Sequence, residues 1–334
     1  MDAPLPAARP RRIVVPSGGI GGARFLRGLL AAAPDAEVTV IGNTADDITL
    51  FGLRICPDLD TLMYTLGGGI HVEQGWGRDQ ETYVVKSELA AYGAGPDWFG
   101  LGDRDLATHI VRTQMLDAGY PLSEVTTALC TRWGLAARGV RLLPMTDDRV
   151  ETHVVIDEPG SGERKAVHFQ EWWVRYRAEP KAQSIVPVGA DEAEAGPGVV
   201  EAIAEADIVL LAPSNPVVSI GTVLAVPGVR AALRKTEASI VGISPIIDNK
   251  PVRGMADACL TAIGLETSAQ AVGRHYGSRA CSDNGILDGW LVHTGDTADV
   301  PSVAVRAVPL FMSDVDATAA MAKAAFDLGG VDLD

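Results

Sequence analysis

Cysteine, aromatic residues and basic charge are all scarce in this chain of 334 residues. Its four cysteines are widely separated and include no C-x-x-C pair, so neither a disulfide framework nor a zinc site is indicated. Lys and Arg number 28 against 43 Asp and Glu, which gives a net charge of −15 with no block of basic residues. Such a chain has little electrostatic attraction for nucleic acids or anionic membranes, and we expect neither as a partner.

No segment of the sequence is suited to span a membrane. The uncharged run from Ile208 to Val229 contains three prolines, which would interrupt a helix across a bilayer. Residues 1–11 contain arginines and prolines but no signal-peptide pattern, and we expect them to form a disordered tail. Together with the unpaired cysteines, these features predict a cytoplasmic protein.

The order of hydrophobic patterns predicts an α/β fold with a Rossmann-like, doubly wound and mainly parallel sheet. A short apolar strand at 13–15 leads into a glycine cluster at 18–22 and then a helical pattern at 23–33, as such folds begin. A second strand is expected at 38–41, and strands and helices alternate again after residue 197. These later elements are helices at 198–206, 222–234 and 255–264, a C-terminal helix from about Asp316, and strands at 208–212, 239–243 and 303–308.

Two insertions interrupt this alternation. The first, at about 62–135, is helical, with helices expected at 81–92, 104–118 and 121–133 and with Asp103 as the N-cap of the second. The second, at about 140–190, is a small β extension with strands expected at 152–156 and 165–175. We therefore expect residues 12–334 to form a single α/β domain that carries a helical insertion and a β extension.

The glycine cluster Gly18-Gly19-Ile20-Gly21-Gly22 is the first candidate site. Glycines allow close backbone approach, and the free N–H groups of the helix that follows favour an anion. The G-G-x-G-G spacing differs from the G-x-G-x-x-G of dinucleotide-binding proteins, and no P-loop pattern is present. A tight turn between strand and helix would need the same glycines, so the cluster alone leaves both interpretations open.

A group of aspartates near this cluster is the second candidate site. Asp46 and Asp47 follow the second strand, and Asp58 and Asp60 come eleven residues later. If residues 57–60 are extended, Asp58 and Asp60 point the same way. Any one of these aspartates is suited to cap a turn or a helix. As a group at the carboxyl end of a sheet, they predict a Mg²⁺ site.

Three further segments carry polar or aromatic side chains at expected loop and helix ends. Trp98 and Phe99 offer a flat surface for a ring before the helix in which Asp105 and His109 are spaced to pair. The rigid loop Pro213-Ser214-Asn215-Pro216 follows a strand and suits a nucleotide base or phosphate. The loop 244–254 repeats this design and adds Lys250 and Arg253, which are candidates for phosphate contacts.

These segments, in this order, resemble the 2-phospho-L-lactate transferase family of coenzyme F-420 biosynthesis, and most closely its actinobacterial branch, the phosphoenolpyruvate transferases. The resemblance extends from about residue 12 to the C-terminus. Two positions depart from it, because the family usually has Gly at Ala45 and small residues at Asp248-Asn249. The segments that carry it are Gly18–Arg24, Asn43–Asp47, Arg54–Thr61, Gly100–His109, His168–Arg177, Ala212–Ile220 and Ser244–Gly254.

The resemblance implies transfer of a phosphoenolpyruvyl or phospholactyl group from a guanosine diphosphate-type donor to the ribityl hydroxyl of a deazaflavin, with release of GMP. It also implies that the protein is a homodimer. Its implied catalytic residues are Asp46, Asp47 and Asp60, and its implied Mg²⁺ ligands are Asp46, Asp60 and Asp58. The implied nucleotide-binding residues are Gly19, Gly21, Gly22, Thr44, Ser214, Asn215, Ser219 and Lys250. The implied acceptor-binding residues are Trp98, Phe99, Gly100 and Asp103.

Two other functions remain as alternatives. A related family with a similar glycine loop binds nucleotide sugars and regulates without turnover, and the aspartate group argues against that function here. A nicotinamide-dependent dehydrogenase is disfavoured by the glycine spacing and by the Asn-Thr-Ala-Asp-Asp end of the second strand.

Overall fold

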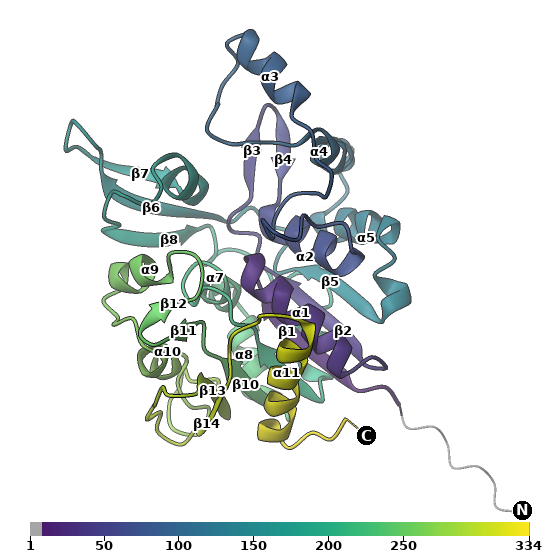
Figure 1. Ribbon diagram of the computed structural model, residues 1–334, viewed down its shortest axis with the longest axis vertical. Coiled ribbons are helices and arrows are strands. Elements are labelled where there is room, and N and C mark those ends of the chain that lie inside the picture. The colour runs from purple at the N-terminus through teal and green to yellow at the C-terminus, as the bar shows by residue number, and fades with distance from the viewer. Residues whose placement is uncertain (1–8, 334) are drawn as a thin grey trace, which may run out of the picture.

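A computed structural model describes residues 9–333, and a seven-stranded sheet runs through its centre (Figure 1). All neighbouring strands of this sheet are parallel, in the order β14-β13-β10-β9-β1-β2-β5. The Rossmann-like α/β fold expected from the sequence is therefore confirmed. The strands are β1 (Arg12–Ser17), β2 (Glu37–Gly42), β5 (Val140–Pro144), β9 (Ile208–Leu211), β10 (Ser239–Ile243), β13 (Gly289–His293) and β14 (Ala304–Val308).

The strand order reverses between β1 and β9, the first and fourth strands of this sheet along the chain. From β1 the chain moves outward through β2 to β5, and then returns to the other side of β1 with β9. Loops that leave two such strands diverge to opposite faces and open a crevice at the carboxyl ends, where ligands bind in open α/β sheets. The glycine cluster follows β1 and the Pro213–Pro216 loop follows β9, so both lie at this crevice.

Helices cover both faces of the sheet. Successive side chains of β1 point to opposite faces of the sheet, so Ile13 and Val15 lie in one hydrophobic core and Val14 lies in the other. The first core is covered by α1 (Gly19–Ala32), α2 (Pro57–Gly67), α5 (Leu122–Arg132) and α11 (Val315–Gly329). The second is covered by α6 (Val199–Ala204), α7 (Ile220–Ala225), α8 (Val229–Lys235), α9 (Ala256–Ala262) and α10 (Ala269–Tyr276).

The helical insertion forms the arm at the top of Figure 1. Its carboxylates cap helices reciprocally: Asp103 accepts from the N–H groups of Val84 and Val85, and Glu81 accepts from those of Arg104 and Asp105. Asp103 therefore caps the neighbouring helix, and the N-cap of its own helix is Gly102. The elements of this region besides α2 and α5 are β3 (Ile48–Leu50), β4 (Leu53–Ile55), α3 (Val84–Ala91), α4 (Asp103–Asp117) and η1 (Ala136–Arg138).

The β extension is a three-stranded antiparallel sheet of β6 (Glu151–Asp157), β7 (Arg164–His168) and β8 (Ser184–Val188). The expected boundary at residue 140 is wrong, because β5 pairs with β2 in the central sheet. The strand expected to reach Arg175 ends at His168, and Glu171–Arg175 form the helical turn η2. Trp172 in that turn is fully buried and donates its indole N–H to the Pro180 carbonyl at 2.8 Å.

Three other expectations differ from the structure. The helix expected at 222–234 is divided into α7 and α8 by Pro227 and by Gly228, whose φ is +88°. The strand β13, the helix α10 and the short hairpin β11 (Ile246–Ile247) with β12 (Lys250–Pro251) were not expected. Of the tail expected at 1–11, residues 1–8 lie outside the described residues, while Arg9 pairs with Asp207 at 2.6 Å.

No helix within residues 9–333 is both long enough and apolar enough to cross a membrane.

The packing of α1 against α11 gives the first prediction. A side chain on Gly28 of α1 would overlap Thr318 of α11, so Gly28→Ala forces the two helices apart. We expect this change to lower the free energy of unfolding by about 1–3 kcal/mol in urea denaturation. Arg27→Ala, an exposed change on the same helix, is the control and should stay within about 0.5 kcal/mol of the original chain. Equal stability of both variants would contradict close packing of these helices.

Candidate functional site

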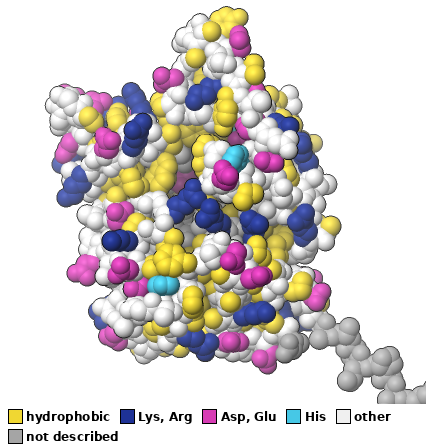
Figure 2. Space-filling view, viewed as in Figure 1, with side chains coloured by type: hydrophobic (Ala, Val, Ile, Leu, Met, Phe, Trp, Pro, Cys, Tyr) yellow, Lys and Arg dark blue, Asp and Glu magenta, His cyan; other side chains and the backbone are white. Residues whose placement is uncertain are grey.

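A cleft of about 840 Å³ opens at the carboxyl ends of the central strands. Figure 2 shows this face hollowed, with Lys and Arg side chains gathered near its middle. The switch point between β1 and β9 lies at its base, since the loops after both strands contribute to the lining. The residues expected from the sequence that line it are Gly19, Gly21, Asp46, Asp58, Asp60, Phe99, Gly100, Ser214, Asn215 and Ser219.

The glycine cluster forms the N-terminal turn of α1 at the base of the cleft. Gly19 has a φ of +62°, and a side chain on Gly22 would overlap the hydroxyls of Ser17 and Ser214. The Ser214 hydroxyl donates to the Gly18 carbonyl at 2.7 Å and accepts from the Gly18 N–H at 3.3 Å. The loop after β9 therefore fixes the turn after β1, and Gly19 and Gly21 of the first turn of α1 line the cleft, where the start of a helix favours an anion.

Asn43, which follows β2, joins both loops to the aspartate group. Its side-chain amide donates to Asp58 Oδ2 at 2.9 Å and to the Val218 carbonyl at 3.1 Å. Its Oδ1 accepts from the Ala45 N–H at 3.0 Å and from the Thr222 hydroxyl at 2.7 Å. Asn43 is fully buried and makes all four of these bonds, so it holds the β2 loop, α2 and α7 in one arrangement.

Asp46 and Asp58 are buried carboxylates that line the cleft with no basic partner among the described residues. Asp46 Oδ1 is buried and makes no hydrogen bond within residues 9–333. Burial, and then the charge of Asp58, raise the pKa of Asp46 well above its usual range. Burial raises the pKa of Asp58 to about 6, although Asn43 and the Gly19 N–H oppose the shift. This pair lacks positive charge and has an oxygen free, which fits a divalent cation.

Asp60 points away from Asp58. Pro57 is the first residue of α2, so 57–60 form a helical turn, and the expectation of an extended segment is wrong. Asp60 forms a bidentate ion pair with Arg112 of α4, which is buried with it. Burial alone would lower the pKa of Arg112, but the charge of Asp60 raises it. The negative charge of Asp60 is therefore balanced by the guanidinium of Arg112.

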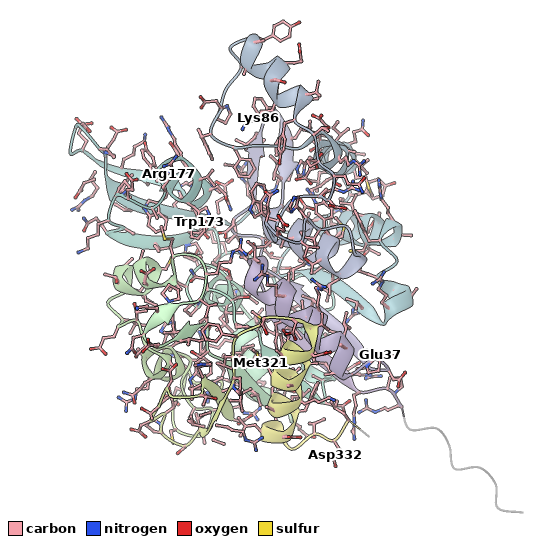
Figure 3. All side chains as sticks on the ribbon, in the orientation of Figure 1. Glu37, Lys86, Trp173, Arg177, Met321 and Asp332 are labelled. Atoms are coloured by element: carbon pink, nitrogen blue, oxygen red, sulfur yellow. The ribbon has the colours of Figure 1, made fainter. Side chains whose placement is uncertain are left out.

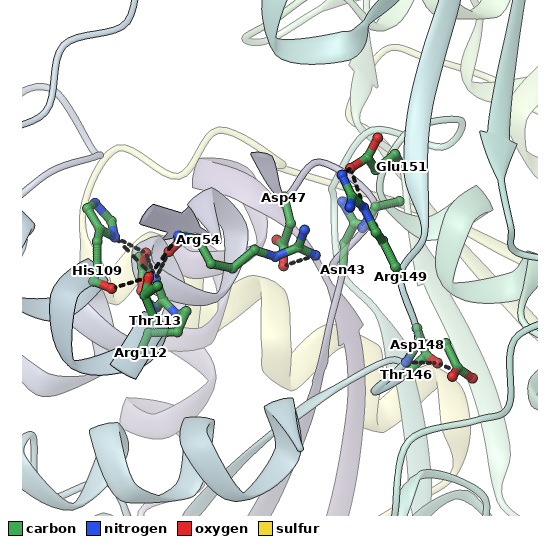
Figure 4. Close-up of polar contacts among 12 residues, drawn as sticks. Asn43, Asp47, Arg54, His109, Arg112, Thr113, Thr146, Asp148, Arg149 and Glu151 are labelled. Atoms are coloured by element: carbon green, nitrogen blue, oxygen red, sulfur yellow. Dashed lines mark hydrogen bonds and ion pairs between the residues drawn. The ribbon is translucent and has the colours of Figure 1, made fainter. Parts of the chain in front are cut away.

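A hydrogen-bonded network extends from this pair through α4 (Figure 4). His109 lies 3.6 Å from Asp60 through Nδ1 and 3.4 Å from Asp105 through Nε2, so Asp105 and His109 are neighbours as their spacing predicts, while Nε2 makes no hydrogen bond within residues 9–333. The Tyr64 hydroxyl donates to Asp105 at 2.6 Å. Ligand atoms of Asp60, Asp105 and His109 lie within 4.8 Å of one another, as in a metal site. The Arg112 guanidinium on Asp60 makes this group less suited to a cation than Asp46 and Asp58.

Asp47 also has an arginine partner, since Arg54 Nη2 lies 3.2 Å from its Oδ2 (Figure 4). Burial raises the pKa of Asp47 to about 7, and Arg54 opposes this shift. The Arg54 carbonyl in turn accepts from Arg112 Nη1 at 3.3 Å, so the two ion pairs are connected. Asp47 does not line the cleft.

Aromatic side chains from distant parts of the chain form the upper walls of the cleft. Two lobes project from the central sheet in Figure 3: the β extension, where Trp173 lies in η2, and the helical insertion, where Lys86 lies in α3. Such walls offer flat apolar surfaces for a planar ring. The aromatic residues that line the cleft are Tyr64, Trp76, Phe99, Phe169, Trp173 and Phe311.

Comparisons with known proteins agree with this architecture. A family model described as 2-phospho-L-lactate transferase CofD matches residues 13–322. A phosphoenolpyruvate transferase of Nocardia farcinica is 63% identical over 98% of this chain and 97% of its own length. A phosphoenolpyruvate transferase of Streptomyces griseus is 65% identical over 95% of this chain and 98% of its own length. This chain belongs to the 2-phospho-L-lactate transferase family.

A solved structure supports the fold of this transferase. It is that of a UPF0052-family protein from Bacillus halodurans, with a TM-score of 0.60 and 16% sequence identity. The structural match covers 96% of this chain and 100% of the Bacillus halodurans chain. At this identity the likeness establishes the shared fold alone.

Six residues expected in the transferase site do not line the cleft. Asp103 caps α3, and Lys250 is exposed on the β11–β12 hairpin, where Arg253 lines the cleft instead. Trp98 packs edge-on against Phe99, with ring centroids 5.8 Å apart. The departure at Asp248-Asn249 forms the turn of the hairpin, with positive φ at both residues, and Asp248 is exposed. The expected residues outside the lining are Gly22, Thr44, Asp47, Trp98, Asp103 and Lys250.

Burial of carboxylates predicts a pH dependence for the metal-free transferase. The pKa values of Asp58 and Asp47 are about 6 and about 7, above the ~4 of an unfolded chain, so the folded state keeps protons that the unfolded state has released. The free energy of unfolding should therefore fall as the pH rises from about 4 to 7. Asp58→Asn should reduce this slope and stabilise the protein by roughly 1–3 kcal/mol at pH 7.5.

Urea denaturation in EDTA across this pH range checks this prediction, with the exposed Asp35→Asn as the control that keeps the original slope. A free energy of unfolding that rises between pH 5 and 7, or an unchanged slope in Asp58→Asn, would contradict it.

Proposed function

We propose that this transferase moves a phosphoenolpyruvyl or phospholactyl group from a guanosine diphosphate-linked donor to the ribityl hydroxyl of a deazaflavin, with release of GMP. This reaction would belong to coenzyme F-420 biosynthesis. The observation that carries the proposal is 63–65% identity over nearly the full length to proteins named phosphoenolpyruvate transferase. The cleft supports it, because anion-binding, cation-binding and ring-binding features meet in one cavity.

The donor's phosphates would lie on the N-terminal turn of α1. The N–H groups near Gly19 and Gly21 present partial positive charge there, as in other nucleotide sites at helix starts. Ser219 and Asn215 from the loop after β9 complete this wall. Asn215 accepts from the N–H of Val217 at 2.9 Å, which keeps its loop rigid beside the phosphates.

Asp46 and Asp58 would hold Mg²⁺, since they are the carboxylates of the cleft that lack a basic partner among the described residues. When bound, the ion would offset the negative charge of the diphosphate during transfer. Asn43 fixes the orientation of Asp58 through the 2.9 Å bond to Oδ2. Asp60, with its guanidinium partner, would shape this wall without binding the ion.

Transfer to a hydroxyl depends mainly on positioning and charge neutralisation, so the demand on a base is modest. Asp46 would hold the ion through one carboxylate oxygen and accept the hydroxyl proton at the other as the new bond forms. The deazaflavin ring would lie against the aromatic walls, near Phe99 and Gly100. We also propose that the protein forms a homodimer, as the resemblance to the family implies.

Product analysis tests the reaction directly. The full chain is incubated with Mg²⁺, the deazaflavin and each synthetic donor, one with phosphoenolpyruvate and one with phospholactate, and the products are identified by mass spectrometry. We expect GMP and a deazaflavin that has gained the phospho-linked acid of one donor. Binding of nucleotide without any product would instead favour the regulatory, non-catalytic alternative.

Two aspartate variants separate a chemical from a structural role. Asp46→Asn should leave a folded protein of equal or greater stability but reduce GMP release by at least about 100-fold. Asp60→Asn leaves Arg112 buried without its partner and should lower the free energy of unfolding by about 3–5 kcal/mol. Circular dichroism, urea denaturation and GMP release are measured for both. An active Asp46→Asn, or an Asp60→Asn as stable as the original chain, would contradict these roles.

A further inference from the structure

Two arginines meet in the cleft outside the features already used. Arg24 lies on α1, one helical turn (about 5.4 Å) beyond Ile20, and Arg253 follows β12. A methyl group placed on Gly75 would lie 3.5 Å from Arg253 Nη1 and 3.8 Å from Arg24 Nη2. Both side chains therefore approach the same point, and both line the cleft.

Neither arginine has an acidic partner within residues 9–333, although the chain carries an excess of acidic residues. Arg24 makes no side-chain hydrogen bond in that range, and Arg253 donates from Nη2 to the Gln74 carbonyl at 2.6 Å. Burial, and then the neighbouring charge of Arg253, lower the pKa of Arg24. Two like charges held together without a counter-ion indicate a place for an anionic ligand.

A loop lies beside both arginines and bonds to Arg253. It is formed by residues 71–77, which we term the strap, and it is closed by bonds between the N–H of Gly75 and the carbonyl of His71 and between the N–H of His71 and the carbonyl of Gly77. A side chain on Gly75 would lie 2.7 Å from Ile20, so the strap rests on the first turn of α1. The bond from Arg253 to Gln74 joins the strap to the β12 side of the cleft.

We propose that Arg24 and Arg253 form a second anion subsite, which binds the carboxylate of the three-carbon acid in the donor. This inference rests on the proposed function. The phosphates of that donor are offset at the N-terminus of α1 and by the cation held by Asp46 and Asp58, which leaves the carboxylate as its one anionic group without a partner. A planar carboxylate matches the two-donor geometry of a guanidinium. Phosphoenolpyruvate and phospholactate both carry the group, so the subsite selects for the acid and not between the two.

Comparison of two ligands isolates the subsite, because GDP has the diphosphate without the acid. Dissociation constants for GDP and for the complete donor are measured by calorimetry with Mg²⁺ and without deazaflavin, so that no transfer occurs. In Arg24→Gln and Arg253→Gln we expect donor binding to weaken at least tenfold, with GDP binding within about twofold of the original. Arg253→Lys keeps the charge but loses the planar fork and should give an intermediate loss.

The matched control is Arg27→Gln, an exposed position on the same helix, which should change neither constant. Melting temperatures confirm that all variants are folded. An equal loss for GDP and donor would overturn the carboxylate assignment in favour of a phosphate contact, and no loss for either would overturn the subsite itself. The proposed function would survive both results. If the original chain bound neither ligand, the proposed function would fail together with the subsite.

Discussion

The buried amide of Asn43 is the contact on which the geometry of the site depends. It links the loop after β2 to α2 through Asp58 and to α7 through Val218 and Thr222. Since each of its polar atoms is occupied, any rearrangement of these loops would leave a buried donor or acceptor without a partner. The carboxylates of the cleft are therefore held close together, although they repel each other when ionised.

The four neighbouring aspartates of the site fall into two classes, those that form an ion pair with an arginine and those that do not. Asp47 and Asp60 carry arginines from β4 and α4, and these ion pairs join the helical insertion to the central sheet. Burial raises the pKa of all four aspartates, and Asp46 and Asp58 have no basic partner among the described residues to oppose it. The same residue type thus forms ion pairs at one pair of positions, and we propose that it binds a ligand at the other.

The sequence supports the fold more fully than the site, for physical reasons that differ between elements. Strand β10 was expected with its exact bounds because a short apolar run stands between polar turns. The run at 169–175 reads as a strand, but a buried Trp172 in a helical turn satisfies the same hydrophobic composition. Strand β13 has no alternation to reveal it, since its interior is buried on both faces.

Within the site, sequence patterns identify which residues are near the ligand but not which partners they have. The Asp58 and Asp60 side chains diverge because Pro57 begins a helix, whereas an extended segment would have aligned them. The partner of Asp60 is Arg112, separated from it by 52 positions, and only the packing of α4 against β4 and α2 brings the two together. Arg24 lies within the glycine-rich segment that carries the family resemblance, so its position was visible, but its convergence with Arg253 depends on the β12 hairpin.

The distribution of unpaired charge limits what can fill the cleft. Asp46 and Asp58, which have no basic partner among the described residues, line the same cavity as Arg24 and Arg253, and no ion pair joins the two sets within residues 9–333. A purely anionic ligand would satisfy Arg24 and Arg253 but add to the repulsion at Asp46 and Asp58, and a cation alone would do the reverse. A ligand that enters with both signs of charge, a divalent cation together with a multiply anionic molecule, neutralises both sets at once. A cation-bound diphosphate ester with an attached acid has this composition, so the electrostatics of the cleft favour the donor class independently of the aromatic walls that would receive the acceptor.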